Sequence, residues 1–138
     1  MNEQKNIKLV QDAYAAFGRN DIDGILALSS NDIDWHTYGP TELPMGGPRK
    51  GKPEVRRFFD DVAKSWNFSR FEPRDFIASG DVVVSFGRYE GTAKSTNRPF
   101  AAEFCHSFTI KDGKVTRFRE YTDTANLIAA LQPSLSRV

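Results

Sequence analysis

Apolar residues in the first half of the chain recur every three or four positions, the spacing of one face of an α-helix. Residues 7–17, 21–28 and 53–66 show this pattern and are predicted to be helices. Asp21 is a suitable N-cap for the second helix, and Pro53 suits the first turn of the third. The chain therefore begins with helical segments that each bury one apolar face.

After Phe68 the pattern changes to an alternation with period two, which is typical of half-buried strands. Strands are predicted at residues 71–78, 81–92, 100–110 and 115–122, after a shorter one at 33–38. The pair Asp112-Gly113 predicts a tight hairpin between the last two strands. The Gly- and Pro-rich segment 39–52 is predicted to be a loop of the kind that forms lids, and residues 124–131 a final helix.

Helices that precede a meander of strands define an α+β fold. We expect one domain over residues 1–138, because this length is normal for a single domain. Two or three helices packed on one face of a curved sheet would enclose an apolar pocket.

Composition narrows the function classes. The 19 basic and 18 acidic residues give a formal charge of +1, which argues against general binding to nucleic acid. No apolar run is long enough for a secretion signal or for a membrane span, so we expect a cytoplasmic protein without a membrane partner. Cys105 is the single cysteine and has no disulfide partner within the chain.

Aromatic residues make up 12% of the chain, and such side chains fill cores or line apolar ligand cavities. We expect a small apolar molecule as the binding partner. The residues predicted to contact it are Tyr14, Trp35, Tyr38, Phe59, Phe86 and Phe104.

Three segments resemble the SnoaL-like branch of the nuclear-transport-factor-2-like (NTF2-like), or ketosteroid-isomerase-like, superfamily. They are residues 13–17 with 20–23, residues 51–59, and residues 112–115 followed by 119–123. The resemblance covers nearly the whole chain. It implies a curved antiparallel sheet wrapped around N-terminal helices as a cone-shaped α+β barrel, a deep pocket, and a homodimer through the sheet. It implies no single activity, because this fold hosts isomerases, cyclases, hydrolases, dehydratases and binding domains.

Steroid isomerisation requires a base carboxylate and an oxyanion hole formed by a tyrosine and a protonated acid. By resemblance these groups fall near Thr37, Ala13 and Cys105, none of which is equivalent. Tyr14 lies one position from the expected tyrosine, or about 100° around a helix. The sequence therefore argues against that reaction.

A polyketide-cyclase type of reaction requires an acidic residue and a histidine that share proton transfers. His106 is predicted to point inward, because it shares a strand face with Phe104 and Phe108. On the next strand, periodicity leaves open whether Arg119, Tyr121 and Asp123 or Phe118, Glu120 and Thr122 point inward. The resemblance favours the first set, with Asp123 as acid/base, His106 as its partner, and Tyr121 or Arg119 stabilising charge on oxygen.

Structural roles compete with these assignments. Asp123 precedes the last helix and is a suitable N-cap, and His106 is also interpretable as a core residue. An epoxide-hydrolase network would need an arginine, which Arg88, Arg117 or Arg119 could supply, together with Asp123 and a second inward carboxylate, which is not evident. With two histidines and no helical histidine pair we expect no metal, and we expect no cofactor. The sequence thus leaves two hypotheses, an acid–base enzyme for an apolar carbonyl compound and a non-catalytic binding or dimerisation domain.

Overall fold

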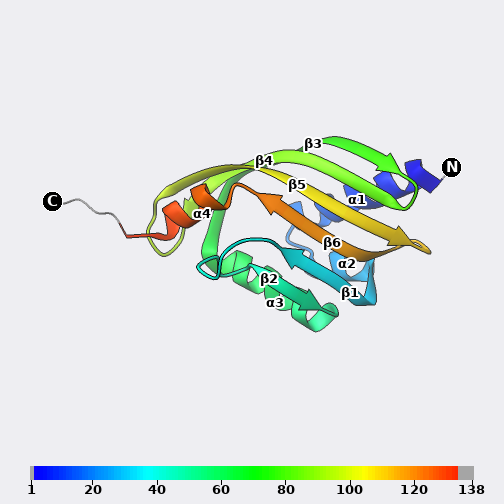
Figure 1. Cartoon of the computed structure of the whole chain (residues 1–138), viewed down its shortest axis with the longest axis horizontal. Helices are drawn as coiled ribbons and strands as arrows, with labels where there is room; N and C mark the ends of the chain where they lie inside the picture. Colours follow the sequence, from blue (N-terminus) through cyan, green and yellow to red (C-terminus); the bar gives the residue numbers. More distant parts are fainter. Residues whose placement is uncertain (1, 134–138) are drawn as a thin grey trace.

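The computed structural model describes residues 2–133, which form an α+β fold (Figure 1). The helices are α1 (Asn2–Gly18), α2 (Ile22–Ala27), α3 (Lys52–Ser65) and α4 (Thr124–Leu131). The strands are β1 (Ser29–Thr37), β2 (Gly47–Lys50), β3 (Trp66–Ser79), β4 (Val82–Ala93), β5 (Pro99–Lys111) and β6 (Lys114–Thr122). The α+β class expected from the sequence is confirmed.

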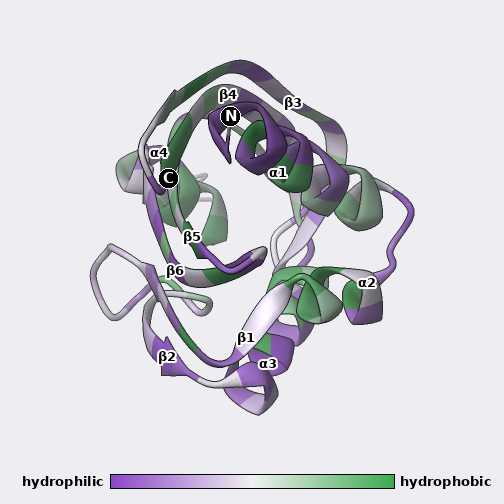
Figure 2. Ribbon diagram, turned by 90° about the vertical axis from the view of Figure 1, so that its right-hand side faces the viewer, coloured by the Kyte–Doolittle hydropathy of each residue, from purple (hydrophilic) through white to green (hydrophobic). Residues whose placement is uncertain are grey.

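The six strands form one curved sheet in the order β2-β1-β6-β5-β4-β3. The meander β3–β6 is antiparallel throughout, but β1 pairs with β6 in parallel. The sheet remains open, with β2 and β3 as its edges, so the expected barrel is unclosed. In Figure 2 the sheet curves around α1, and α3 lies against β1 and β2. The ring of Phe17 in α1 lies 6.0 Å from that of Phe59 in α3, between centroids, so both helices are on the concave side of the sheet.

Strands β3 and β4 are curved, and they contain two β-bulges and two glycines, Gly87 and Gly91, at close approaches of the two backbones. The register of β3 against β4 shifts between Phe68 and Arg70 and again between Pro73 and Asp75. Beside these bulges, a Cβ on Gly91 would lie 1.8 Å from the backbone oxygen of Asn67. A bulge bends its strand, and only glycine allows such a close approach of the two backbones.

Several predicted boundaries were wrong. The predicted loop 39–52 contains β2, an edge strand whose alternation is too polar to be recognised. Strand β1 starts at Ser29, which pairs with Val115 of β6, and not at Ile33 as predicted. The start was missed because the first residues of the strand are polar and show no apolar alternation. Trp66 continues the helical spacing of α3 but has extended backbone angles and begins β3.

Local signals that rest on a specific contact were confirmed. Asp21 caps α2 by accepting a hydrogen bond from the Gly24 amide at 2.9 Å. Asp112 and Gly113 have positive φ angles of 52° and 75°, as the hairpin between β5 and β6 requires. The cap of α2 and the turn between β5 and β6 help to position the elements that form the cavity.

Candidate active site

An apolar cavity of about 100 Å³ lies between the helices and the concave face of the sheet. Aromatic side chains form most of its wall, including both tryptophans of the chain, Trp35 and Trp66. Tyr14, His106 and Glu120 supply polar groups to the same wall. The cavity therefore combines an apolar binding volume with groups that exchange protons.

Tyr14, His106 and Glu120 are joined by consecutive hydrogen bonds. The Tyr14 hydroxyl lies 2.6 Å from Nδ1 of His106 and 2.5 Å from Oγ of Ser85. Nε2 of His106 lies 2.9 Å from Oε2 of Glu120. His106 is 5% exposed and Glu120 is 8% exposed, so the chain of contacts is shielded from solvent.

Further hydrogen bonds hold the carboxylate of Glu120. Thr37 donates to Oε1 at 3.0 Å, and the Tyr89 hydroxyl donates to Oε2 at 3.0 Å. Burial acts to raise the pKa of Glu120, but the electrostatic attraction of His106 and the hydrogen bonds from His106, Thr37 and Tyr89 outweigh it and lower the pKa. Glu120 is therefore a charged group at neutral pH inside an apolar wall.

The ionised carboxylate determines the pattern of donors along the network. Glu120 accepts from Nε2 of His106, and the other ring nitrogen, Nδ1, lies against the Tyr14 hydroxyl. Burial strongly raises the pKa of Tyr14, so this hydroxyl retains its proton. The Ser85 hydroxyl also lies within hydrogen-bond distance of the Tyr14 oxygen. Each group of the network has a hydrogen-bond partner. A proton that moves from one group to the next therefore changes which atom carries the charge.

Four elements bring these residues together. Tyr14 comes from α1, Ser85 from β4, His106 from β5 and Glu120 from β6. Ser85 and His106 are directly paired across β4 and β5, and His106 and Glu120 are paired across β5 and β6. Side chains opposite one another on neighbouring strands lie on the same face of a sheet, so the register itself builds the network.

The predicted inward orientation of His106 is confirmed, but the predicted face of β6 is wrong. Phe118 and Glu120 are buried, whereas Tyr121 is 50% exposed. Polar residues occupy both faces of β6, so alternation alone gave no answer. Phe118 pairs with Phe108 across β5 and β6, and both are buried. Because aromatic residues favour the core, this pair is the signal that the face of β6 with Phe118 and Glu120 points inward.

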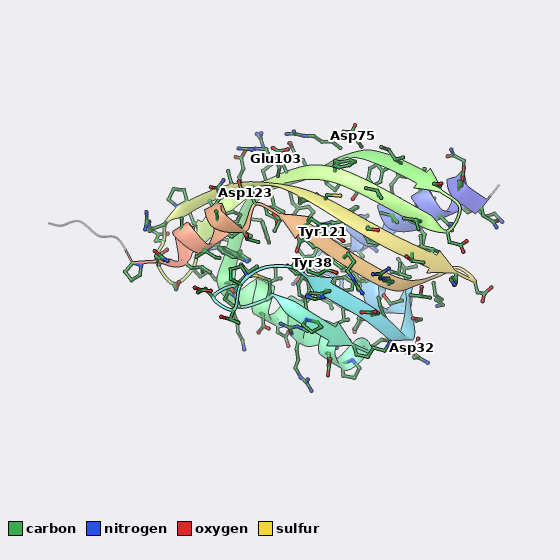
Figure 3. All side chains as sticks on the ribbon, in the orientation of Figure 1. Asp32, Tyr38, Asp75, Glu103, Tyr121 and Asp123 are labelled. Carbon is green, nitrogen blue, oxygen red and sulfur yellow. The ribbon has the colours of Figure 1, made fainter. Side chains whose placement is uncertain are left out.

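Asp123, Tyr121 and Arg119 therefore lie outside the cavity. Asp123 caps α4 and accepts from the Asn126 side chain at 2.8 Å. Tyr121 stacks on Tyr38 at 5.1 Å between ring centroids, on the convex face of the sheet (Figure 3). Arg119 binds Asp34 on the same face at 3.1 Å. The carboxylate that accompanies His106 is Glu120, three positions before the predicted acid.

The predicted ligand contacts divide into two groups. Tyr14, Trp35 and Phe59 line the cavity. Phe104 is buried beside it and stacks on His106 at 4.2 Å, but it is not part of the wall.

Tyr38 and Phe86 are 38% and 43% exposed on the convex face, so their predicted place in the pocket was wrong. Phe86 follows Ser85, whose side chain points inward, and strand alternation turns Phe86 outward.

Two of the positions compared with steroid isomerases belong to the network after all. Thr37 binds Glu120, and Tyr14 reaches His106 despite its displacement by one residue. Cys105 lies on the other face of β5 from His106.

Within residues 2–133, no three His, Cys, Asp or Glu side chains cluster as they would around a metal ion. In the same range no helix has the length and apolar character needed to cross a membrane.

Comparisons with known proteins agree with this fold. The fold places the chain in the NTF2-like class, because it aligns with an NTF2-like protein from Burkholderia xenovorans LB400 at a TM-score of 0.86 and 35% identity, covering 94% of this chain and 98% of that one. Residues 10–118 match the model of the SnoaL-like domain. The chain therefore belongs to the SnoaL-like domain family.

Two further solved structures are similar. TerC, co-crystallised with polyporic acid, has a TM-score of 0.81 and 32% identity over 91% of this chain and 97% of its own. A protein from Rhodopseudomonas palustris named as a candidate isomerase has a TM-score of 0.74 and 27% identity, covering 88% and 90%. No curated protein matches the chain.

Proposed function

We propose that this protein catalyses proton transfer on a small apolar molecule that carries a carbonyl group, as an isomerase or cyclase does. The observation that carries the proposal is the charged Glu120 buried in the wall of an apolar cavity and linked through His106 to Tyr14. Perturbed, hydrogen-bonded acid–base groups in a concave apolar site are typical of catalytic centres. Likeness to a protein named as a candidate isomerase supports the same reaction class.

The network assigns a role to each group. Oε1 of Glu120 accepts only from Thr37 among the described residues, so it retains a lone pair for a proton taken from the carbon next to the carbonyl. When the carbonyl compound binds, the Tyr14 hydroxyl turns its single proton toward the carbonyl oxygen and stabilises the negative charge that develops there. His106 joins the two, since it contacts both Glu120 and Tyr14 and can return the proton between them.

The proposed reaction removes a proton from carbon and then returns a proton to carbon. The carbon–hydrogen bond breaks, its proton passes to Glu120, and the electron pair forms the enol or enolate whose oxygen binds Tyr14. Return of a proton to the same carbon gives exchange, and return to another carbon gives an isomer. No redox partner is required.

The test is hydrogen exchange from heavy water into a panel of cyclic ketones, followed by mass spectrometry. His106→Gln is expected to lower the exchange rate about 100-fold, a typical size for acid–base catalysis. His36→Gln is the matched control, because the second histidine of the chain lies on the convex face beside Tyr38. Equal rates in both variants, or no exchange above buffer with any ketone, would contradict the proposal.

Binding without turnover is a second candidate, favoured by a specific observation. Oε2 of Glu120 already accepts from both His106 and Tyr89, as expected for a carboxylate with a purely structural role. TerC, a relative, was crystallised with polyporic acid. Quenching of Trp35 and Trp66 fluorescence by polyporic acid, without hydrogen exchange in any ketone, would favour this alternative.

A further inference from the structure

A second, larger space adjoins the cavity. This outer groove has a volume of about 790 Å³ and lies between the end of α1 with α2 on one side and α3 with the start of β3 on the other. Seven residues line both spaces. They are Tyr14, Phe17, Phe59, Val62, Trp66, Phe68 and Phe71.

The shared wall forms a neck around Phe17. Its ring lies 5.0 Å from that of Phe71 and 6.0 Å from those of Phe59 and Phe68, measured between centroids. Rings at these distances are in contact and separate the cavity from the groove, so a molecule that reaches the Tyr14 hydroxyl from the groove has to push them apart. Phe17 lies in the last turn of α1, directly before the turn in which Asn20 has a φ of 59°.

The volume of the inner cavity limits what it holds. A protein cavity of about 150 Å³ accepts benzene, and the inner cavity here is about 100 Å³. It therefore takes no more than one ring with modest relaxation of its wall. Any larger substrate extends through the neck into the groove.

The groove differs chemically from the cavity. Asp23 pairs with Arg56, and Arg70 pairs with Glu72, so most of its charges are neutralised by the protein. Asp60 has no ion-pair partner among the described residues, which leaves the groove slightly negative and disfavours an acidic ligand. Asn67 and Ser69 add uncharged groups that form hydrogen bonds.

We infer that the groove is a second subsite for the same molecule. The ligand then has two parts, a single apolar ring with a carbonyl in the inner cavity and an uncharged, hydrogen-bonding extension in the groove. This inference rests on the proposed function only in placing the reacting ring inside the cavity.

Three ligands with one ring test it through the fluorescence of Trp35 and Trp66, which line the cavity. Acetophenone fills only the inner cavity. 4′-(2-Hydroxyethoxy)acetophenone adds an uncharged extension, and 4-acetylphenoxyacetic acid adds an acidic one of similar length. The hydroxyethoxy compound is expected to bind about tenfold more tightly than either of the others, because it alone gains contacts in the groove without a charge penalty.

A variant locates the gain. Ala63 lines the groove but not the cavity, so Ala63→Phe is expected to reduce the tenfold ratio to about threefold or less. Lys64→Phe is the control, since Lys64 lines neither space, and it should retain the full ratio.

A ratio near one in the wild type, tighter binding of the acid, a ratio unchanged in Ala63→Phe, or no binding of any compound would overturn the inference. These experiments measure binding and not turnover. They therefore test the second subsite even if the protein does not catalyse the proposed reaction.

Discussion

At the scale of the residue, the proposed chemistry depends on the ionisation of Glu120. Three donors, from Thr37, Tyr89 and His106, surround one carboxylate that is nearly inaccessible to water. Such a group stabilises the fold only while it is charged, because its donors are arranged for an anion. The same charge is what the proposed proton transfer uses.

This ionisation predicts a pH dependence of stability. The pKa of Glu120 is lower in the folded protein than its ordinary value of 4.5, so its contribution is fully present above pH 4.5 and is lost as pH falls through the folded pKa. The difference in unfolding free energy between wild type and Glu120→Gln should therefore shrink below pH 4.5. Urea titrations of both proteins from pH 7 to pH 3 measure it.

Asp34 and Glu90 also have lowered pKa values, from hydrogen bonds with Arg119 and Arg88 respectively, but both residues are present in each protein and their effects cancel. A difference that stays constant across this range would show that Glu120 carries no stabilising charge.

Part of this residue set follows from the sequence. His106, Tyr14, Trp35 and Phe59 were predictable because each continues an apolar face of a helix or strand. Glu120 was not selected, because polar residues alternate on both faces of β6 and only the partner strand decides which face is inward. A buried carboxylate depends on donors from distant elements, and these contacts have no local signal.

At the scale of the element, the bulges of β3 are the feature most sensitive to substitution. A Cβ on Gly91 would overlap the backbone oxygen of Asn67, and one on Gly87 would lie 2.3 Å from that of Glu72. Gly91→Ala is therefore expected to cost more than about 2 kcal/mol of unfolding free energy, because a backbone must move. Thermal and urea unfolding provide the measurement.

The control for this prediction is Gly18→Ala. Gly18 ends α1, and a Cβ there would meet nothing within 4 Å. Alanine has the higher helix propensity, so this change should be neutral or stabilise by up to about 1 kcal/mol. Comparable losses in the two variants would mean that the close approach in the bulge has no energetic weight.

The elements themselves were largely predictable, since α1, α3 and the meander β3–β6 follow from apolar periodicity. The missed parts are β2 and the first residues of β1 and β3. Each has a polar or ambiguous pattern and is held by pairing with a strand distant in sequence, such as Ser29 with Val115. Tertiary pairing decides these segments.

At the scale of the whole molecule, the convex face of the sheet exposes several large apolar side chains. Tyr38, Phe86 and Tyr121 are exposed there, together with Ile77 (Figure 3 labels Tyr38 and Tyr121). Exposed apolar patches of this kind commonly mark protein interfaces. We expect a second copy of the chain to cover this face.

Light scattering after gel filtration tests the expectation. The wild type should have twice the chain mass of 15.6 kDa, and Tyr121→Lys should shift it toward the monomer, because a charge would be buried in the interface. Gln11→Lys on the exposed side of α1 should remain dimeric. A monomeric wild type, or a dimer unaffected by Tyr121→Lys, would disprove pairing through this face.

The central claim is that Glu120, rather than the nearby Asp123, is the acid–base group. The most direct measurement compares the rate of hydrogen exchange from heavy water into a ketone substrate for Glu120→Gln and Asp123→Asn. A loss of about 100-fold or more is expected for Glu120→Gln. The rate is expected to be unchanged for Asp123→Asn, because asparagine caps a helix as well as aspartate does. An unchanged rate in Glu120→Gln, or a comparable loss in Asp123→Asn, would contradict the assignment of Glu120.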